Sequence, residues 1–145
     1  IGMGSGICGM ISARDALGLE TKIIGVVAED AAAYALSFEQ KKAISTNTAD
    51  TVADGLACRI PDENALAIIL AGADDVVKVS EDEIRAAMRY YFLDTHNLTE
   101  GAAAAPLAAL MKQKNLRQGK KVGLVNSGGN VDADTFKDVM SGELK

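Results

Sequence analysis

The sequence predicts an α/β fold, an open, mostly parallel twisted sheet flanked by helices. Short apolar runs at residues 22–27, 75–79 and 121–125 have the length and the valine and isoleucine content of strands buried in a parallel sheet. Segments with the apolar spacing of helices separate these runs. Because strands that alternate with helices build parallel sheets, residues 1–145 are expected to form a single α/β domain.

The composition is that of a globular protein that does not bind nucleic acid. The 145 residues are 48% hydrophobic and 24% charged, which suits one domain with its own core. A net charge of -5 argues against nucleic acid, which requires a concentrated positive field. No apolar stretch has bilayer-spanning length, and Cys8 and Cys58 show neither a disulfide framework nor metal-ligand spacing. We therefore expect a cytoplasmic protein without a membrane partner or a metal.

The opening loop is a candidate anion site. Glycine occupies positions 2, 4, 6 and 9, and the chain then follows helical spacing. A glycine-rich loop before a helix presents main-chain N–H groups and the positive end of the helix dipole, which together bind phosphate. The main chain of this loop is therefore a predicted phosphate cradle, with the Ser5 hydroxyl as an extra donor.

Two kinds of ligand fit this loop. Residues 4–9 match Gly-x-Gly-x-x-Gly, and Glu29 follows Gly9 by 20 residues, where a dinucleotide-binding fold places its ribose-binding acid. That fold also needs a strand before the loop, and only Ile1 precedes it here. The other ligand is the single phosphate of a cofactor, and a loop that serves only as a tight turn is a third interpretation. Because a domain rarely opens inside its binding loop, we expect a fragment of a longer protein.

The first half of the chain should alternate helix and strand. A helix from residue 7 to a stop at Gly18 precedes the strand at residues 22–27. Alanine-rich residues 30–42 favour a second helix, whereas residues 43–60 lack periodicity and contain turn-forming residues. A third helix should start at residues 62–64 and end near Gly72. The residues expected to face the core are Tyr34, Phe38, Leu66, Ile69 and Leu70.

A capping box predicts the next helix. The oxygen of Ser80 can accept from the N–H of Glu83, and the Glu83 side chain can accept from the N–H of Ser80 in return. The helix should run to about His96 and bury one apolar face. That face comprises Ile84, Met88, Tyr91 and Phe92.

Two helices and a strand complete the predicted chain. An alanine-rich helix should follow from Thr99, with Pro106 in its first turns, where proline is tolerated. The strand at residues 121–125 comes next, and Asp132 should cap the last helix, residues 133–140. The predicted buried stripe of the alanine-rich helix is Leu107, Leu110 and Met111.

Three polar or glycine-rich loops should line one edge of the sheet. These are residues 2–6, 51–57 and 127–130. Ligands of open α/β sheets bind at the carboxyl ends of the strands. One ligand with a phosphate and a flat ring could therefore contact all three loops.

Four motifs resemble the threonine dehydratase and serine racemase family in order and approximate spacing. They are Gly-Met-Gly-Ser-Gly at 2–6, Thr-x-Ala-Asp-Gly at 51–55, Thr-Glu-Gly-Ala at 99–102 and Ser-Gly-Gly-Asn at 127–130. Members of this family are pyridoxal-phosphate enzymes of the tryptophan synthase β-like fold, or fold type II. The resemblance covers essentially the whole chain, as the C-terminal portion of such an enzyme, and implies pyridoxal 5'-phosphate as the cofactor.

The resemblance also implies how the cofactor is held. The N–H groups of residues 2–6 would bind the phosphate, and Ser127 would hydrogen-bond the pyridine nitrogen. Since a hydroxyl does not hold a proton on that nitrogen as a carboxylate would, elimination is favoured over transamination. Gly55 and Glu100 match positions beside the ring, with Glu100 outside the direct path of proton transfer. The implied cofactor contacts are Gly2, Met3, Gly4, Ser5, Gly6, Gly55, Glu100 and Ser127.

The chain departs from the family pattern in ways that bear on catalysis. Met3 and Ser5 replace glycines, a change that leaves the main-chain donors in place. Glu29 matches a metal-binding glutamate of serine racemases, but Ala35 stands where the partner carboxylate would be, so no metal is expected. In this family the lysine that forms the Schiff base lies in the N-terminal part, and no lysine here matches it. The chain is therefore expected to supply no catalytic residue itself and to need a lysine-bearing N-terminal part.

The implied activity is that of a lyase. A dehydratase of this family would eliminate water from threonine, serine or 3-hydroxyaspartate and release a 2-oxo acid and ammonia. The alternatives are a serine or amino-acid racemase on the same scaffold, a dinucleotide-binding Rossmann domain and a non-catalytic binding module. Family members are often homodimers.

Overall fold

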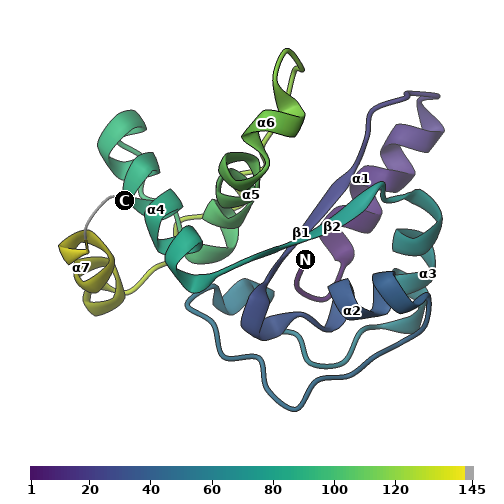
Figure 1. The fold of residues 1–145 in the computed structure, drawn as a ribbon, viewed down its shortest axis with the longest axis horizontal. Coiled ribbons are helices and arrows are strands. Elements are labelled where there is room, and N and C mark those ends of the chain that lie inside the picture. The colour runs from purple at the N-terminus through teal and green to yellow at the C-terminus, as the bar shows by residue number, and fades with distance from the viewer. Residues whose placement is uncertain (143–145) are drawn as a thin grey trace. The chain divides into compact units, whose positions relative to one another are not determined.

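The computed structural model describes residues 1–142, which form two compact units (Figure 1). Unit 1 consists of Ile1–Thr51 and Leu56–Lys78. Unit 2 consists of Val52–Gly55 and the residues from Val79 onward. Each unit is described by itself, and the single domain expected from the sequence stays a prediction.

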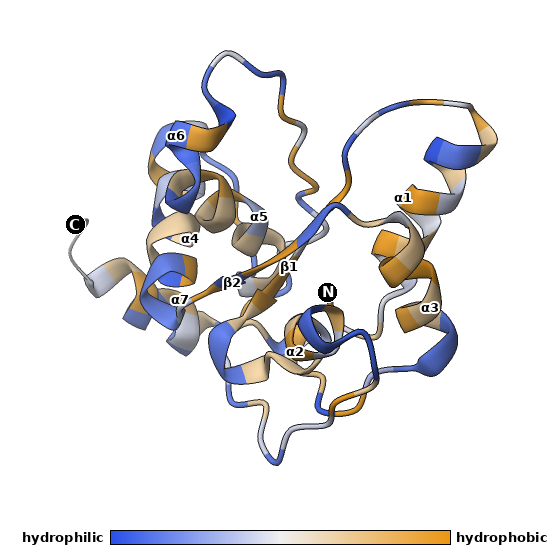
Figure 2. Ribbon diagram, turned by 45° about the vertical axis from the view of Figure 1, so that its right-hand side comes forward, coloured by the Kyte–Doolittle hydropathy of each residue, from blue (hydrophilic) through white to orange (hydrophobic). Residues whose placement is uncertain are grey.

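Unit 1 contains the sheet. Strand β1 (Ile24–Ala28) pairs with strand β2 (Asp75–Val79), which ends at the boundary with unit 2, in a small parallel sheet. Both strands are hydrophobic along most of their length (Figure 2). The predictions of these two strands are confirmed. The helices of this unit are α1 (Ser5–Ala16), the short 3-10 helix η1 (Glu29–Ala31), α2 (Ala33–Gln40) and α3 (Glu63–Gly72), and a second 3-10 turn, η2 (Asp54–Leu56), crosses its boundary.

The core of unit 1 joins the sheet to α2 and α3. Tyr34, Leu66 and Ile69 are buried there, as predicted, and they pack with Val27 and Val76 from the two strands. The remaining predicted core residues are only partly buried against this cluster, namely Phe38 and Leu70.

Helix α1 is fixed against α3 by a glycine contact. A side chain at Gly72 would collide with the side chain of Ile11, so only glycine lets the two helices approach this closely. The Arg14 guanidinium donates to the Gly72 carbonyl at 2.9 Å and so caps the C-terminal end of α3. The position of α1, and with it the loop that precedes α1, is set by this packing.

Unit 2 is helical in its described part. Helix α4 (Glu81–Thr95) starts with the predicted capping box, in which the Ser80 Oγ accepts from the Glu83 N–H at 3.2 Å and the Glu83 carboxylate accepts from the Ser80 N–H at 2.8 Å. The Asp132 cap is also confirmed, because its carboxylate accepts from the Thr135 N–H at 2.9 Å. Hydrogen bonds from the Thr135 side chain and backbone lower the pKa of Asp132. The other helices are α5 (Gly101–Lys112), α6 (Lys114–Arg117) and α7 (Ala133–Ser141).

The buried face of α4 matches the prediction only in its first half. Ile84 and Met88 are buried, as predicted. Tyr91 is only partly buried, and Phe92 is 38% exposed. Phe92 instead meets Phe136 of α7 edge to face, with 5.1 Å between the ring centroids.

The predicted buried stripe of α5 is wrong. Met111 is 40% exposed, and Leu107 and Leu110 are only partly buried. Alanine forms the buried face, which allows α5 to lie close to α4 because small side chains keep the helix axes near each other. The buried alanines are Ala103, Ala104, Ala105, Ala108 and Ala109.

The predicted third strand is also absent from the described chain. Residues 121–125 are extended without strand pairing, and Val122 and Val125 are 44% and 51% exposed. An extended segment becomes a strand only when a neighbour accepts and donates its backbone hydrogen bonds. Within residues 1–142 the sheet consists of β1 and β2 alone.

The helices of residues 1–142 are also too short or too polar for a membrane crossing. None of them meets the length and hydropathy that such a span requires.

Candidate cofactor site

The opening loop turns into α1 at Gly4. This residue has φ 98°, in the left-handed region that favours glycine. A Cβ placed on Gly4 would lie 2.8 Å from the Cβ of Ala65 and 3.1 Å from the Tyr34 hydroxyl oxygen. Conformation and space therefore both require glycine at position 4, one of the glycines for which the sequence predicted a turn. Gly6 and Gly9 were expected to share this freedom, but α1 begins at Ser5 rather than at residue 7 and includes both.

The start of α1 leaves main-chain donors available. The Cys8 N–H makes the first helical hydrogen bond, to the Gly4 carbonyl at 3.0 Å. The N–H groups of Ser5, Gly6 and Ile7 therefore have no acceptor within the helix, and no described side chain caps it. A Cβ at Gly6 would meet no atom within 4 Å, so the space above this turn is open. Three N–H groups and a helix dipole thus converge where a phosphate would bind.

The side chain of Tyr34 is hydrogen-bonded to the opening loop. The Tyr34 hydroxyl donates to the Met3 carbonyl at 2.8 Å and accepts from the Asp62 N–H at 3.1 Å. The sequence predicted Tyr34 only as a residue that faces the core. The signal for a second role is its hydroxyl, since a tyrosine on a buried helix face needs a hydrogen-bond partner.

The Cys8 thiol, in the first turn of α1, is not activated as a nucleophile. Burial raises the pKa of Cys8, and its thiol points to the Ala65 carbonyl at 3.5 Å. A thiol with a raised pKa carries less thiolate at neutral pH than a free cysteine. Cys8 therefore packs α1 against α3.

In unit 2 the loop that carries Gly55 is held by two elements. The Val52 N–H donates to the Glu81 carboxylate at 2.7 Å, which ties the loop to the start of α4. A Cβ at Gly101 would lie 2.9 Å from the Cα of Ala53, so the first residue of α5 must be glycine for the loop to approach. Gly55 itself faces α5, because its Cβ would lie 2.9 Å from that of Ala102.

The segment that carries Ser127 is held by the residues that begin α5. The Glu100 N–H donates to the Gly128 carbonyl at 3.1 Å, and the Glu100 carboxylate accepts from the Asn130 N–H at 2.8 Å. The Asn126 side chain donates to the hydroxyl of buried Thr99 at 3.0 Å. These bonds bracket Ser127, whose side chain is exposed.

The structure thus gathers the predicted contacts into two groups. Residues 2–6 lie together in unit 1, whereas Gly55, Glu100 and Ser127 are arranged around the start of α5 in unit 2. Contact of a single ligand with both groups stays a prediction. Among residues 1–142 no group of three histidine, cysteine, aspartate or glutamate side chains could hold a metal ion.

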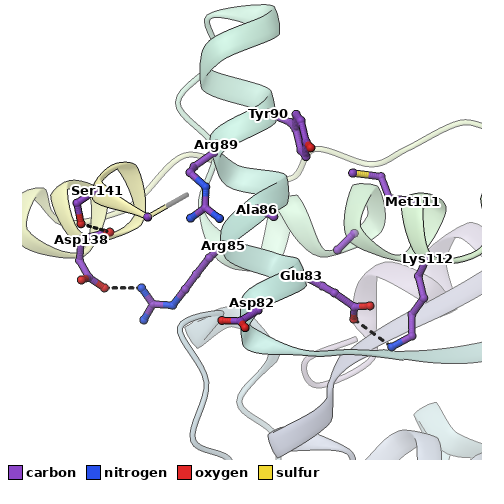
Figure 3. Close-up of a pocket in the computed structure, with 12 residues that line it drawn as sticks. Asp82, Glu83, Arg85, Ala86, Arg89, Tyr90, Met111, Lys112, Asp138 and Ser141 are labelled. Atoms are coloured by element: carbon purple, nitrogen blue, oxygen red, sulfur yellow. Dashed lines mark hydrogen bonds and ion pairs between the residues drawn. The ribbon is translucent and has the colours of Figure 1, made fainter. Parts of the chain in front are cut away.

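Unit 2 also has a surface hollow, away from the predicted contacts, between α4, α5 and α7 (Figure 3). Two ion pairs lie in its lining, Arg85 with Asp138 and Lys112 with Glu83, and Arg89 donates to the Val139 carbonyl. None of the predicted cofactor contacts belongs to its lining. The hollow is therefore not assigned to the candidate site.

Comparison with known proteins decides between the possible ligands. Residues 1–128 match the protein family described as pyridoxal-phosphate dependent enzyme. The chain belongs to this family. The matched region includes all eight predicted contacts, and only residues 129–130 of the last motif lie beyond it. The dinucleotide-binding alternative is therefore not retained.

Relatives of this pyridoxal-phosphate dependent family member include dehydratases and racemases. L-threonine dehydratase catabolic TdcB of Staphylococcus aureus (strain N315) is 36% identical over 144 residues, covering 97% of this chain and 41% of the relative. The processed form of threonine deaminase isoform 2 from Solanum lycopersicum matches with TM-score 0.88 and 28% identity, over 97% of this chain and 42% of that one. Maize serine racemase matches with TM-score 0.86 and 27% identity, over 97% of this chain and 44% of the racemase chain.

These matches confirm the fold class predicted from the sequence. The structural neighbours are enzymes of fold type II, and the chain has their α/β architecture. The chain spans about two fifths of the length of the curated relative from Staphylococcus aureus. The uncapped start of α1 fits the phosphate of pyridoxal phosphate, and the contact of Ser127 with the ring nitrogen stays a prediction.

Proposed function

We propose that this chain is the part of a pyridoxal-phosphate-dependent dehydratase that holds the phosphate and ring nitrogen of the cofactor. The proposed reaction removes water from a small hydroxy amino acid, namely threonine, serine or 3-hydroxyaspartate, and releases a 2-oxo acid and ammonia. The observation that carries the proposal is the uncapped start of α1 after the left-handed Gly4. Family membership and the identity to a threonine dehydratase support it.

Each group of residues has a defined task in this proposal. When bound, pyridoxal phosphate supplies an electron-withdrawing ring that makes the Cα proton of an amino acid acidic. The N–H groups of residues 2–6 hold the phosphate, with the Ser5 hydroxyl as an additional donor. The Ser127 hydroxyl donates a hydrogen bond to the ring nitrogen and, unlike a carboxylate, does not hold a proton on it.

The remaining two contacts support the ring from the side. Gly55 leaves room beside the ring because it has no side chain. Glu100 keeps the Ser127 segment in place through its bonds to Gly128 and Asn130. The proposed site still needs the Schiff-base lysine and the loop that binds the substrate carboxylate, and we place both in an N-terminal part of the protein outside these residues.

Introduction of a carboxylate at position 127 tests this proposal. In the complete gene product that contains these residues, Ser127→Asp should keep the cofactor bound and lower dehydration of threonine or serine about 100-fold, the loss typical of one misplaced polar group at a reaction centre. Ser127→Thr is the matched control, because it keeps a hydroxyl. Steady-state release of 2-oxo acid measures both, and an unchanged rate in Ser127→Asp would contradict the assigned role.

A racemase is the second candidate function. The similarity to maize serine racemase supports it. The same incubations distinguish the two, since a racemase converts L-serine to D-serine faster than it releases 2-oxo acid. Chiral chromatography of the residual amino acid measures that ratio.

Two further statements belong to this proposal. We place the protein in the cytoplasm, and we infer a homodimer from the resemblance to its family. Light scattering after size-exclusion chromatography of the complete gene product tests the second statement, and a monomeric mass would contradict it.

A further inference from the structure

The Tyr34 hydroxyl sits at a junction of three segments of unit 1. The residue belongs to α2, is 1% exposed and lies in the core cluster with Leu66 and Ile69. Its hydroxyl reaches the opening loop at the Met3 carbonyl and the start of α3 at the Asp62 N–H. One buried oxygen thus joins two segments that flank the proposed phosphate site.

The bond to Met3 fixes more than a carbonyl. In a trans peptide the C=O of one residue and the N–H of the next point in opposite directions. The Met3 carbonyl is held toward Tyr34 at 2.8 Å, so the N–H of Gly4 must point away from Tyr34. Rotation of this peptide would break a buried hydrogen bond and leave the carbonyl without its partner.

The other contacts of the hydroxyl keep it a donor toward Met3. Its oxygen accepts from the Asp62 N–H at 3.1 Å, which orients the O–H toward the remaining acceptor, the Met3 carbonyl. Burial raises the pKa of Tyr34, so the O–H keeps its proton throughout the neutral range. Gly4 lies against the same oxygen, as shown by the 3.1 Å that would separate it from a Cβ at that position.

We propose that Tyr34 is a positioning residue for the cofactor phosphate, because it holds the Met3–Gly4 peptide with its N–H turned toward the bound anion. This inference rests on the proposed function, since it assumes that residues 2–6 bind a phosphate. The role belongs to the hydroxyl alone. The ring of Tyr34 fills the core whether or not the hydroxyl is present.

The test compares two ligands that differ only in the phosphate. In the complete gene product, Tyr34→Phe removes the bonds to Met3 and from Asp62. Loss of the Met3 bond should weaken binding of pyridoxal 5'-phosphate by roughly fivefold to tenfold and leave binding of pyridoxal unchanged. Equilibrium dialysis with absorbance detection measures both constants. The 31P resonance of the bound cofactor should also shift in the variant. Tyr91→Phe, in α4 of unit 2, is the matched control and should change the affinity for neither ligand.

The outcomes separate this inference from the proposed function. If the wild-type protein fails to bind pyridoxal phosphate, both the proposed function and the inference are wrong. If the wild type binds pyridoxal phosphate and Tyr34→Phe lowers the affinity for both ligands equally, or for neither, the proposed function stands and the inference is wrong. Should Tyr34→Phe fold poorly, 4-aminophenylalanine at position 34 restores a donor of similar shape, and the ratio of the two affinities must then return to the wild-type value.

Discussion

At the scale of single residues, the opening loop depends on Gly4. Its φ of 98° and the 2.8 Å that would separate a Cβ from Ala65 each exclude other residues. Gly9, in the same loop motif, has neither constraint, because it lies inside α1 and a Cβ there would meet no atom within 4 Å. Two glycines that look equivalent in the sequence therefore have different tasks.

This difference predicts opposite effects of the same substitution. Gly4→Ala should lower the free energy of unfolding by about 1–2 kcal/mol from backbone conformation alone, before any overlap with Ala65 is counted. Gly9→Ala should raise it by about 0.5–1 kcal/mol, because alanine is the better helix former. Urea unfolding measures both variants. Equal effects of the two substitutions would show that the left-handed turn at Gly4 does not form.

Residue-scale features were only partly readable from the sequence. The glycine motif predicted the turn at Gly4, since only glycine tolerates that conformation. The bond from Tyr34 to Met3 was not predictable, because it joins residues 31 positions apart and depends on how α2 packs. The same limit applies to Glu100, whose bond to Asn130 spans 30 positions.

At the scale of elements, the start of α5 organises the second group of contacts. Gly101 admits the loop of residues 52–55, and Glu100 accepts from the Asn130 N–H while its own N–H donates to Gly128. The Ser127 segment has no strand partner in the described chain, so these bonds provide its anchoring there. Helix α5 thus compensates for the missing pairing of residues 121–125.

Removal of the Glu100 carboxylate should therefore loosen this segment. Glu100→Ala should increase amide hydrogen exchange at Asn130 by roughly fivefold to tenfold, as expected for one lost hydrogen bond. Glu100→Gln keeps an oxygen acceptor and should stay near the wild-type rate. Exchange followed by NMR measures both, and wild-type protection in Glu100→Ala would place the anchor elsewhere.

Element boundaries were predictable where local chemistry sets them. The capping box at Ser80 and the Asp132 cap are local patterns, and the helices begin where these patterns indicate. The strand at residues 121–125 and the buried face of α5 depend on distant partners. An apolar run shows that a segment can pair as a strand, and an alanine-rich sequence shows that a helix can pack closely. Neither pattern identifies the element that the segment or helix contacts.

At the scale of the whole molecule, the described chain provides the two groups of residues that we propose bind the cofactor. It has an uncapped start of α1 and an exposed Ser127, and it covers 41% of a threonine dehydratase relative. The resemblance places the Schiff-base lysine before the first residue described. Our central claim is that the complete gene product binds pyridoxal phosphate through these residues and holds it covalently through a lysine elsewhere.

One measurement tests this claim most directly. The purified gene product is examined by its absorption spectrum and then reduced with borohydride, and the mass of every polypeptide and of its peptides is determined. We predict pyridoxal absorbance and a reduced pyridoxyl group on a lysine outside these 145 residues. A pyridoxyl group on a lysine within them, or no pyridoxal absorbance in a folded gene product, would contradict the account.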